Sequence, residues 1–134
     1  MKYLKNTIIL VGIFAIIGVA NAFAETFHYA NISIPALHGT WTSAQKEKRT
    51  STQQSFTNNG ARDALNNTYT MGGRTQAMYD PVGYSSWKYA SSGGGTANWG
   101  NQNTGINDYK LHLRADNYNA LSISFTGSWT ISTY

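Results

Sequence analysis

The chain has 134 residues, 41% of them hydrophobic and only 12% charged, and it contains no cysteine. Its formal net charge is +4, but two of its ten Lys and Arg residues lie at the extreme N-terminus, so residues 25–134 carry about +2. This small excess excludes the clustered basic face of a nucleic-acid-binding domain. The lack of cysteine excludes disulfides, so an exported domain must be held together by its hydrophobic core.

Residues 1–24 have the three parts of a secretory signal peptide. Two lysines stand near the start, residues 7–19 form an uncharged apolar run, and small residues follow with the spacing of a cleavage site. The apolar run is shorter than the ~20 residues that usually span a bilayer. We therefore expect cleavage near Ala22 or Ala24 and secretion of one domain over residues 25–134, with a retained N-terminal anchor as the alternative.

Candidate strands then recur about every ten residues, and no window has a convincing helical period. Residues 27–34 alternate but change parity between Tyr29 and Ile32, which predicts a bulge. Pro35 then ends the strand. Residues 49–56 are polar at nearly every position and predict an edge strand or an exposed hairpin arm.

Glycines punctuate the middle of the chain. Gly72-Gly73 predicts a two-residue turn in a hairpin over residues 68–79. A strand is expected over residues 84–90, followed by a Ser/Gly-rich loop and a short segment over residues 96–99.

The last two strands have the clearest alternation. Apolar side chains occupy one side at Tyr109, Leu111, Leu113 and Ala115, and later at Leu121, Ile123, Phe125, Gly127, Trp129 and Ile131. We expect these strands to form an antiparallel hairpin whose apolar sides meet in the core, together with Trp87 and Trp129. The predicted fold is all-β: a single antiparallel β-sandwich of about seven or eight short strands.

No catalytic set is recognisable. The histidines His28, His38 and His112 are not spaced like metal ligands, and His112 is expected to face solvent between Lys110 and Arg114. The six carboxylates of residues 25–134 lie beside turns or basic neighbours, where Asp normally stabilises a turn. We therefore predict a non-enzymatic protein without a cofactor or a metal.

Aromatic and basic side chains are the candidates for binding. Tyrosine and tryptophan give contact area at little entropic cost, and rings near Gly/Ser/Asn loops can stack on sugars. Trp99, between two glycine-rich loops, is the ring most expected to be exposed. The only basic cluster of residues 25–134 is Lys46-Glu47-Lys48-Arg49. It predicts a solvated loop or strand end, with contact to an anionic envelope polymer or lipid as the alternative. The candidate binding residues are Trp99, Tyr84, Tyr89, Lys46, Lys48 and Arg49.

The polar side of the last strand is a row of hydroxyl groups at Ser122, Ser124, Thr126, Ser128 and Thr130. It can be the solvated outside of a sandwich, a docking face for a glycan or a second protomer, or the lumen side of a transmembrane hairpin. We favour the solvated face, which is the default for an antiparallel sheet. The transmembrane hairpin needs a partner strand that alternates equally well, and residues 109–115 are short and carry Lys, His and Arg.

Two resemblances bear on function. Leu113-Arg114-Ala115-Asp116-Asn117, followed by Gly127-Ser128-Trp129, resembles the C-terminal signature of a family of small exported proteins of Gram-positive bacteria, known only as a domain of unknown function. This resemblance implies a signal peptide and an all-β domain, and it implies no activity. Gly39-Thr40-Trp41 and the Tyr/Gly/Asn/Ser-rich body are similar to secreted bacteriocins of the lactococcin β-sandwich type.

Together these features predict an exported, non-enzymatic protein that acts by surface recognition at the bacterial cell envelope. A bacteriocin-like action is one form of this hypothesis. The expected partners are a cell-wall polymer, a glycan or an anionic membrane surface, and not nucleic acid. The alternatives are a pore-forming or fibre-forming β-assembly built on the C-terminal strand, and a secreted hydrolase. Nothing in the sequence indicates an oligomer, and weak association stays open.

Overall fold

The computed structural model describes residues 25–132, which form ten β-strands and no helix. The predicted signal peptide and its cleavage site lie outside the described residues, as do residues 133–134. Within residues 25–132 there is accordingly no helix of the length and hydropathy needed to span a membrane.

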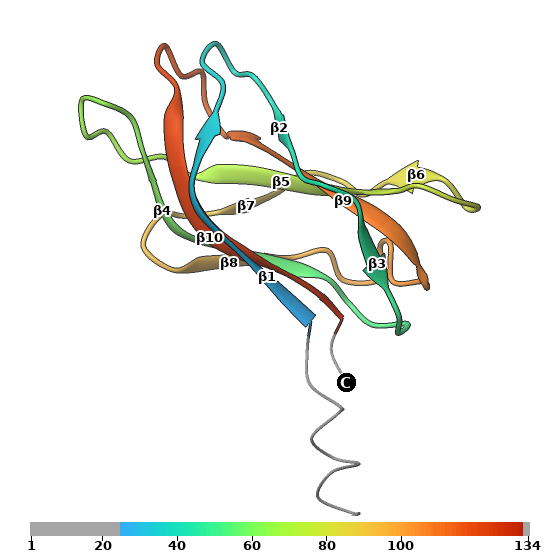
Figure 1. Ribbon diagram of the computed structural model, residues 1–134. Helices are drawn as coiled ribbons and strands as arrows, with labels where there is room; N and C mark the ends of the chain where they lie inside the picture. The colour runs from blue at the N-terminus through green and yellow to red at the C-terminus, as the bar shows by residue number, and fades with distance from the viewer. Residues whose placement is uncertain (1–24, 133–134) are drawn as a thin grey trace, which may run out of the picture.

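The strands form two antiparallel sheets that pack face to face (Figure 1). The first sheet has the order β1 (Glu25–Ile34), β10 (Ile123–Ser132), β4 (Ser55–Arg62) and β8 (Gly95–Asn98). The second sheet has β9 (Asn107–Ala115) and β5 (Met71–Ala77) at its centre; β2 (Trp41–Thr42) and β3 (Lys46–Lys48) pair with β9, and β6 (Gly83–Tyr84) and β7 (Lys88–Ala90) pair with β5. The predicted all-β sandwich is confirmed. Its described strands number ten instead of seven or eight because several are only two or three residues long, and residues 84–90 contribute parts of two strands.

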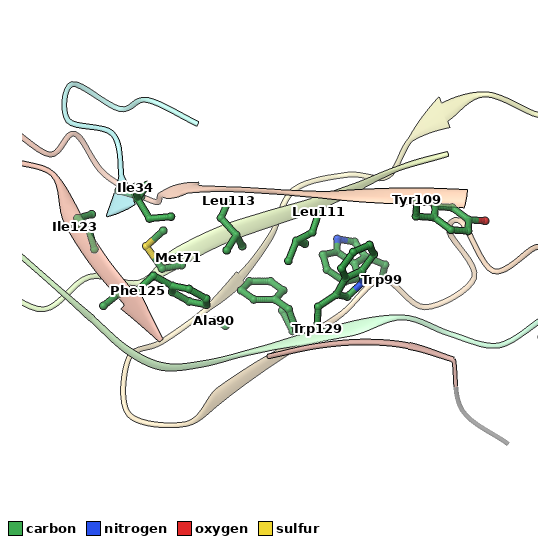
Figure 2. Close-up of a cluster of buried hydrophobic side chains, with 14 of the residues drawn as sticks. Ile34, Met71, Ala90, Trp99, Tyr109, Leu111, Leu113, Ile123, Phe125 and Trp129 are labelled. Atoms are coloured by element: carbon green, nitrogen blue, oxygen red, sulfur yellow. The ribbon is translucent and has the colours of Figure 1, made fainter. Parts of the chain in front are cut away.

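The core lies between the sheets and is lined by the apolar sides predicted for β9 and β10 (Figure 2). Leu121, expected on the same side, is the exception: it precedes β10 and is 38% exposed. Leu113 is 0% exposed, Phe125 1% and Trp129 0%. Each large apolar side chain buried in this way stabilises the fold by about 1.5–3 kcal/mol. The indole N–H of Trp129 donates to Oε1 of the buried Gln54 at 2.9 Å, so its one polar group is satisfied inside the core.

The predicted hairpin between the last two strands is wrong. β9 pairs with β5, β2 and β3 in the second sheet, whereas β10 pairs with β1 and β4 in the first sheet. The chain crosses from one sheet to the other between them. Their apolar sides do meet in the core, but from opposite sheets, because alternation identifies the buried face of a strand and not its neighbour.

Gly72 and Gly73 do not form a turn; they lie inside β5. A Cβ atom on Gly73 would lie 2.7 Å from Cε1 of Phe56, and a Cβ on Gly72 would lie 2.9 Å from Cε1 of Tyr89. The two glycines therefore let aromatic rings from both sides of the sheet pack directly on the backbone of β5.

Two expectations about the first sheet have different outcomes. The register of β1 against β10 shifts between Tyr29 and Ile32, which confirms the predicted irregularity. The expected edge strand over residues 49–56 is wrong: β4 begins at Ser55 and lies between β10 and β8, with a neighbour on each side.

Asn119 links the loop between β1 and β2 to the loop between β9 and β10 by hydrogen bonds. Its Nδ2 donates to the carbonyls of Pro35 at 3.0 Å and Leu121 at 2.8 Å, and its Oδ1 accepts from the backbone N–H of His38 at 3.0 Å. Asn119 is 0% exposed, so these bonds are made without competition from water. The His38 ring also bonds the Ala115 carbonyl at 2.7 Å.

Candidate functional site: aromatic rings and guanidinium groups on the second sheet

The outer face of the second sheet gathers polar and aromatic side chains from four strands. Directly opposite residues of an antiparallel pair point to the same side of a sheet. The outward pairs are Gly72 with Arg114, Arg74 with His112, and Gln76 with Lys110 between β5 and β9, together with Tyr84 of β6 beside Gln76 and Tyr89 of β7 beside Gly72. We call Arg74, Tyr84, Trp87, Tyr89 and Arg114 the aromatic–arginine face.

Stacking of guanidinium groups on rings organises this face. The Arg74 guanidinium carbon lies 4.1 Å from the centre of the Tyr84 ring and 4.8 Å from that of Trp87. The Arg114 guanidinium carbon lies 4.0 Å from the centre of the Trp87 ring. At these distances the cation–π attraction holds ring and guanidinium together. Tyr84 is 54% exposed and Tyr89 48%, so both phenol rings remain open to a ligand.

Gly72 lets Trp87 and Tyr89 approach the sheet. A Cβ at this position would lie 2.9 Å from Tyr89 Cε1 and 3.4 Å from Trp87 Cε3. Because the backbone is bare there, both rings pack against it, which restricts their rotation.

The two guanidinium groups have no acidic partner. The ion pair among residues 25–132 is the exposed contact between Arg49 and Glu47, at 3.9 Å. The Nε atoms of Arg74 and Arg114 are buried and make no hydrogen bond to any described residue. Among the described residues, the two guanidinium groups therefore contact ring faces and no carboxylate.

His112 lies on the same face but is covered, so the expectation that it faces solvent is wrong. Its ring centre is 5.7 Å from that of Tyr84, and the residue is 9% exposed. Nε2 bonds Oε1 of Gln76 at 2.9 Å and Nδ1 bonds Oγ1 of Thr42 at 2.9 Å. Burial, followed by the nearby charges of Arg74 and Lys110, lowers the pKa of His112, so its imidazole is neutral at pH 7.

Trp99 is not part of this face, and the expectation that it is exposed is wrong. Its side chain is 1% exposed and stacks on Phe56 with the ring centres 5.5 Å apart. Its indole N–H donates to the Gly73 carbonyl at 3.2 Å. The flanking polar loops lie at the surface, but Trp99 itself, which directly follows β8, is buried in the core. Trp87, expected in the core, is instead half-buried on the outer face.

The predicted basic cluster does not form a free positive patch. Lys48 is 0% exposed, and its Nζ donates to the Thr50 carbonyl and, at 2.8 Å, to Thr52 Oγ1. Lys46 Nζ lies 4.6 Å from the centre of the Phe27 ring, and Arg49 pairs with Glu47. Lys48 is therefore a buried residue of the domain's interior, which corrects its assignment to a solvated cluster.

The hydroxyl groups expected to share one side of the last strand do so, on the outer face of the first sheet. Ser122 and Ser124 are exposed, and Thr126, Ser128 and Thr130 are partly exposed. Several of these groups bond to β1: Thr130 Oγ1 bonds Thr26 Oγ1 at 3.0 Å, and Thr126 Oγ1 accepts from the Asn31 N–H at 3.1 Å. β10 is flanked by β1 and β4, so both of its edges are occupied.

A shallow polar hollow of about 340 Å³ lies at one end of this hydroxyl surface. It is lined by Asn31, Ser33, Arg62, Asp63, Ala64 and Ser122–Ser124. The Asp63 carboxylate accepts hydrogen bonds from the Asn67 side chain, the Tyr69 hydroxyl and two backbone N–H groups, and these bonds lower its pKa. Asp63 thus organises its own turn and is poorly placed to bind a ligand. Across the described part of the chain, no three His, Asp or Glu residues are grouped to hold a metal ion.

Sequence reasoning identified Tyr84 and Tyr89 but missed Arg74, Arg114 and the outward position of Trp87. The polar side of residues 109–115 was visible in the sequence. Arg74, however, was assigned to a hairpin arm, and its position opposite His112 depends on the pairing of β5 with β9. The sequence therefore contains the polar residues of both strands, but they are recognised as one site only when the register of β5 against β9 is known.

Comparisons with known proteins support the fold and go no further. No protein-family model matches the chain, and no curated protein matches it. The structure is similar to that of the T13 viral particle of IBDV, with a TM-score of 0.53 and 10% sequence identity over 83% of this chain and 31% of the viral chain. The VP2 subviral particle of infectious bursal disease virus has a TM-score of 0.49 at 10% identity, over 83% of this chain and 33% of that one. The CBM22-1–GH10 modules of the Clostridium thermocellum xylanase 10B have a TM-score of 0.42 at 12% identity, over 83% and 28%.

This chain therefore spans about a third of the length of the solved chains that it matches. At such low identity the likeness shows a shared β-sandwich architecture and leaves function to be argued from the site.

Proposed function

We propose that the protein is a non-catalytic recognition module that binds a glycan on the aromatic–arginine face. The observation that carries this proposal is the convergence of Tyr84, Trp87 and Tyr89 on one outer sheet face, with the two phenol rings about half exposed. Ring faces of this kind match the apolar faces of sugar rings, while the polar edges of the site can bond sugar hydroxyl groups.

The rings are held in place before a ligand arrives. Tyr84 and Trp87 stack on Arg74, and Trp87 also stacks on Arg114. Tyr89 packs against the bare backbone at Gly72. Side chains that are already immobile lose little conformational entropy on binding, which favours affinity. The neighbouring Gln76 and Lys110, both partly exposed, supply polar groups on the same face.

We further propose that the protein is exported and that its target is a polysaccharide of the bacterial cell envelope. This part rests on the signal-peptide features of residues 1–24. A bacteriocin-like effect would follow from the same contact if occupying the polymer impairs growth of the target cell.

The test is binding of the purified protein to cell-wall polysaccharide, measured by co-sedimentation and calorimetry. The double variant Tyr84→Ala/Tyr89→Ala is expected to bind at least about tenfold more weakly, because each exposed aromatic contact is worth on the order of 1 kcal/mol or more. The matched control is Tyr79→Ala/Tyr118→Ala, which removes two tyrosines that are 60% and 66% exposed outside this face. Equal affinity of the two double variants would contradict the proposal.

A further inference from the structure

We infer that the glycan is acidic, and that Arg74 and Arg114 bind its anionic groups. The inference rests on the proposed function and names the chemistry of the ligand. It is argued from three features of the aromatic–arginine face: unpaired guanidinium groups, their mutual placement, and the small extent of the positive surface.

The guanidinium groups of Arg74 and Arg114 have hydrogen-bond donors that no described residue uses. Each group carries five N–H donors in a planar fork that matches a carboxylate or a phosphate. Neither forms an ion pair or hydrogen bond with a described residue, and both are partly exposed. With the Nε atoms buried, the terminal amino groups are the donors that a ligand can meet.

Arg74 and Arg114 also lie close to one another. Arg74 is opposite His112 and Arg114 is opposite Gly72, so the two arginines occupy diagonal positions across β5 and β9, where neighbours are about 7–8 Å apart. Lys110 adds a third positive charge on the same side of β9. Burial lowers the pKa of the neighbouring His112, and the positive charges of Arg74 and Lys110 lower it further, which indicates a local positive field on this face. An anion bound between the arginines relieves this repulsion.

The positive surface is small, which favours a ligand whose negative charges are widely spaced. Asp108, near the start of β9, is six residues from Arg114 and therefore about 20 Å away, and Glu47 of β3 lies opposite Asp108. Asp116 follows Arg114 by two residues in an exposed loop. Each strand of a nucleic-acid duplex carries a phosphate about every 3.4 Å of helix axis and would meet these carboxylates. A polysaccharide with about one anionic group per sugar fits the surface better.

The experiment compares pairs of polymers that share a sugar backbone and differ in whether they carry anionic groups. Polygalacturonate is tested against its fully methyl-esterified form, and a phosphomannan against the dephosphorylated mannan, by calorimetry at low and high salt. These two pairs separate carboxylate from phosphodiester as the source of the charge. A single-stranded oligothymidylate is the third arm. We expect at least one acidic polymer to bind about tenfold or more tightly than its neutral form, because bonds to ionised groups are the stronger ones.

Two double variants assign the effect to the arginines. Arg74→Gln/Arg114→Gln is expected to remove the preference for the acidic polymer. Arg49→Gln/Arg62→Gln removes the same charge from exposed positions outside the face and is expected to preserve the preference. Because the glutamine variant also loses stacking on Trp87, Arg74→Lys/Arg114→Lys is included; it keeps the charge, loses the planar fork, and is expected to show an intermediate preference.

The outcomes distinguish the two proposals. Equal binding of the acidic and neutral forms, with the loss in Tyr84→Ala/Tyr89→Ala intact, would overturn the acidic ligand and leave glycan binding standing. An Arg74→Gln/Arg114→Gln variant that folds and keeps the preference would also overturn it, as would tighter binding of the oligothymidylate than of either acidic polymer. No binding of any glycan would overturn both proposals.

Discussion

Lys48 is a buried lysine whose titration makes the stability of the domain depend on pH. It ends β3, is 0% exposed, and has its Nζ bonded to the Thr50 carbonyl and Thr52 Oγ1. Burial lowers its pKa from the ordinary value of 10.5 to about 8, and the Glu25 carboxylate offsets part of this effect. Below pH 8 the folded and unfolded chains both carry the proton. Between pH 8 and 10.5 the unfolded chain binds more protons, so the free energy of unfolding rises with pH.

The size of the rise follows from the two pKa values. Each pH unit between them is worth about 1.4 kcal/mol, and integration from pH 7 to 9.5 gives about 2 kcal/mol. The measurement is urea unfolding followed by tryptophan fluorescence, which reports the exposure of the buried Trp99 and Trp129. The scan ends at pH 9.5 because burial raises the pKa values of Tyr29 and Tyr109, and their ionisation at higher pH opposes folding.

Two variants assign this pH dependence to one side chain. Lys48→Met keeps an unbranched side chain only one atom shorter and removes the titrating group, so its unfolding free energy is expected to lack this rise over the same range. Lys88→Met removes an exposed charge and is expected to retain the full rise. A wild-type rise that persists in Lys48→Met would refute the assignment to Lys48. A flat wild-type profile would show that Nζ is solvated, which contradicts its burial.

Two further predictions, on the contact of β10 with β4 and on the hydrogen bonds of Asn119, use the same urea experiment. Gly127→Ala places a Cβ 2.1 Å from the Thr57 carbonyl oxygen and is expected to cost about 3 kcal/mol or more, whereas Gly60→Ala, with nothing within 4 Å, is expected to change stability by less than about 1 kcal/mol; equal effects would show that β10 and β4 do not approach as described. Asn119→Ala removes three hydrogen bonds from a buried position and is expected to cost about 2–4 kcal/mol, and a loss below about 0.5 kcal/mol would mean that the two loops are held by other contacts.

The candidate site was only partly predictable. Tyr84 and Tyr89 lie near polar, glycine-containing loops, which predicts their exposure, and both are exposed on one face. The same argument failed for Trp99, which directly follows β8, since polar loops on either side of a residue do not determine whether its side chain is buried. The basic run at residues 46–49 predicts a charged surface but not the burial of Lys48, because burial depends on what packs around β3.

The sequence by itself determined the all-β class, the buried sides of β9 and β10, and the irregularity of β1 near Tyr29. These features follow from the two-residue period of a strand, which is a local property of the chain. Only the tertiary structure decided that β9 and β10 belong to opposite sheets, that Gly72 and Gly73 lie in mid-strand, and that Arg74 and Arg114 stack on Trp87. The physical reason is that strand pairing joins residues about 40 positions apart, as between Arg74 and His112, and no local pattern encodes that register.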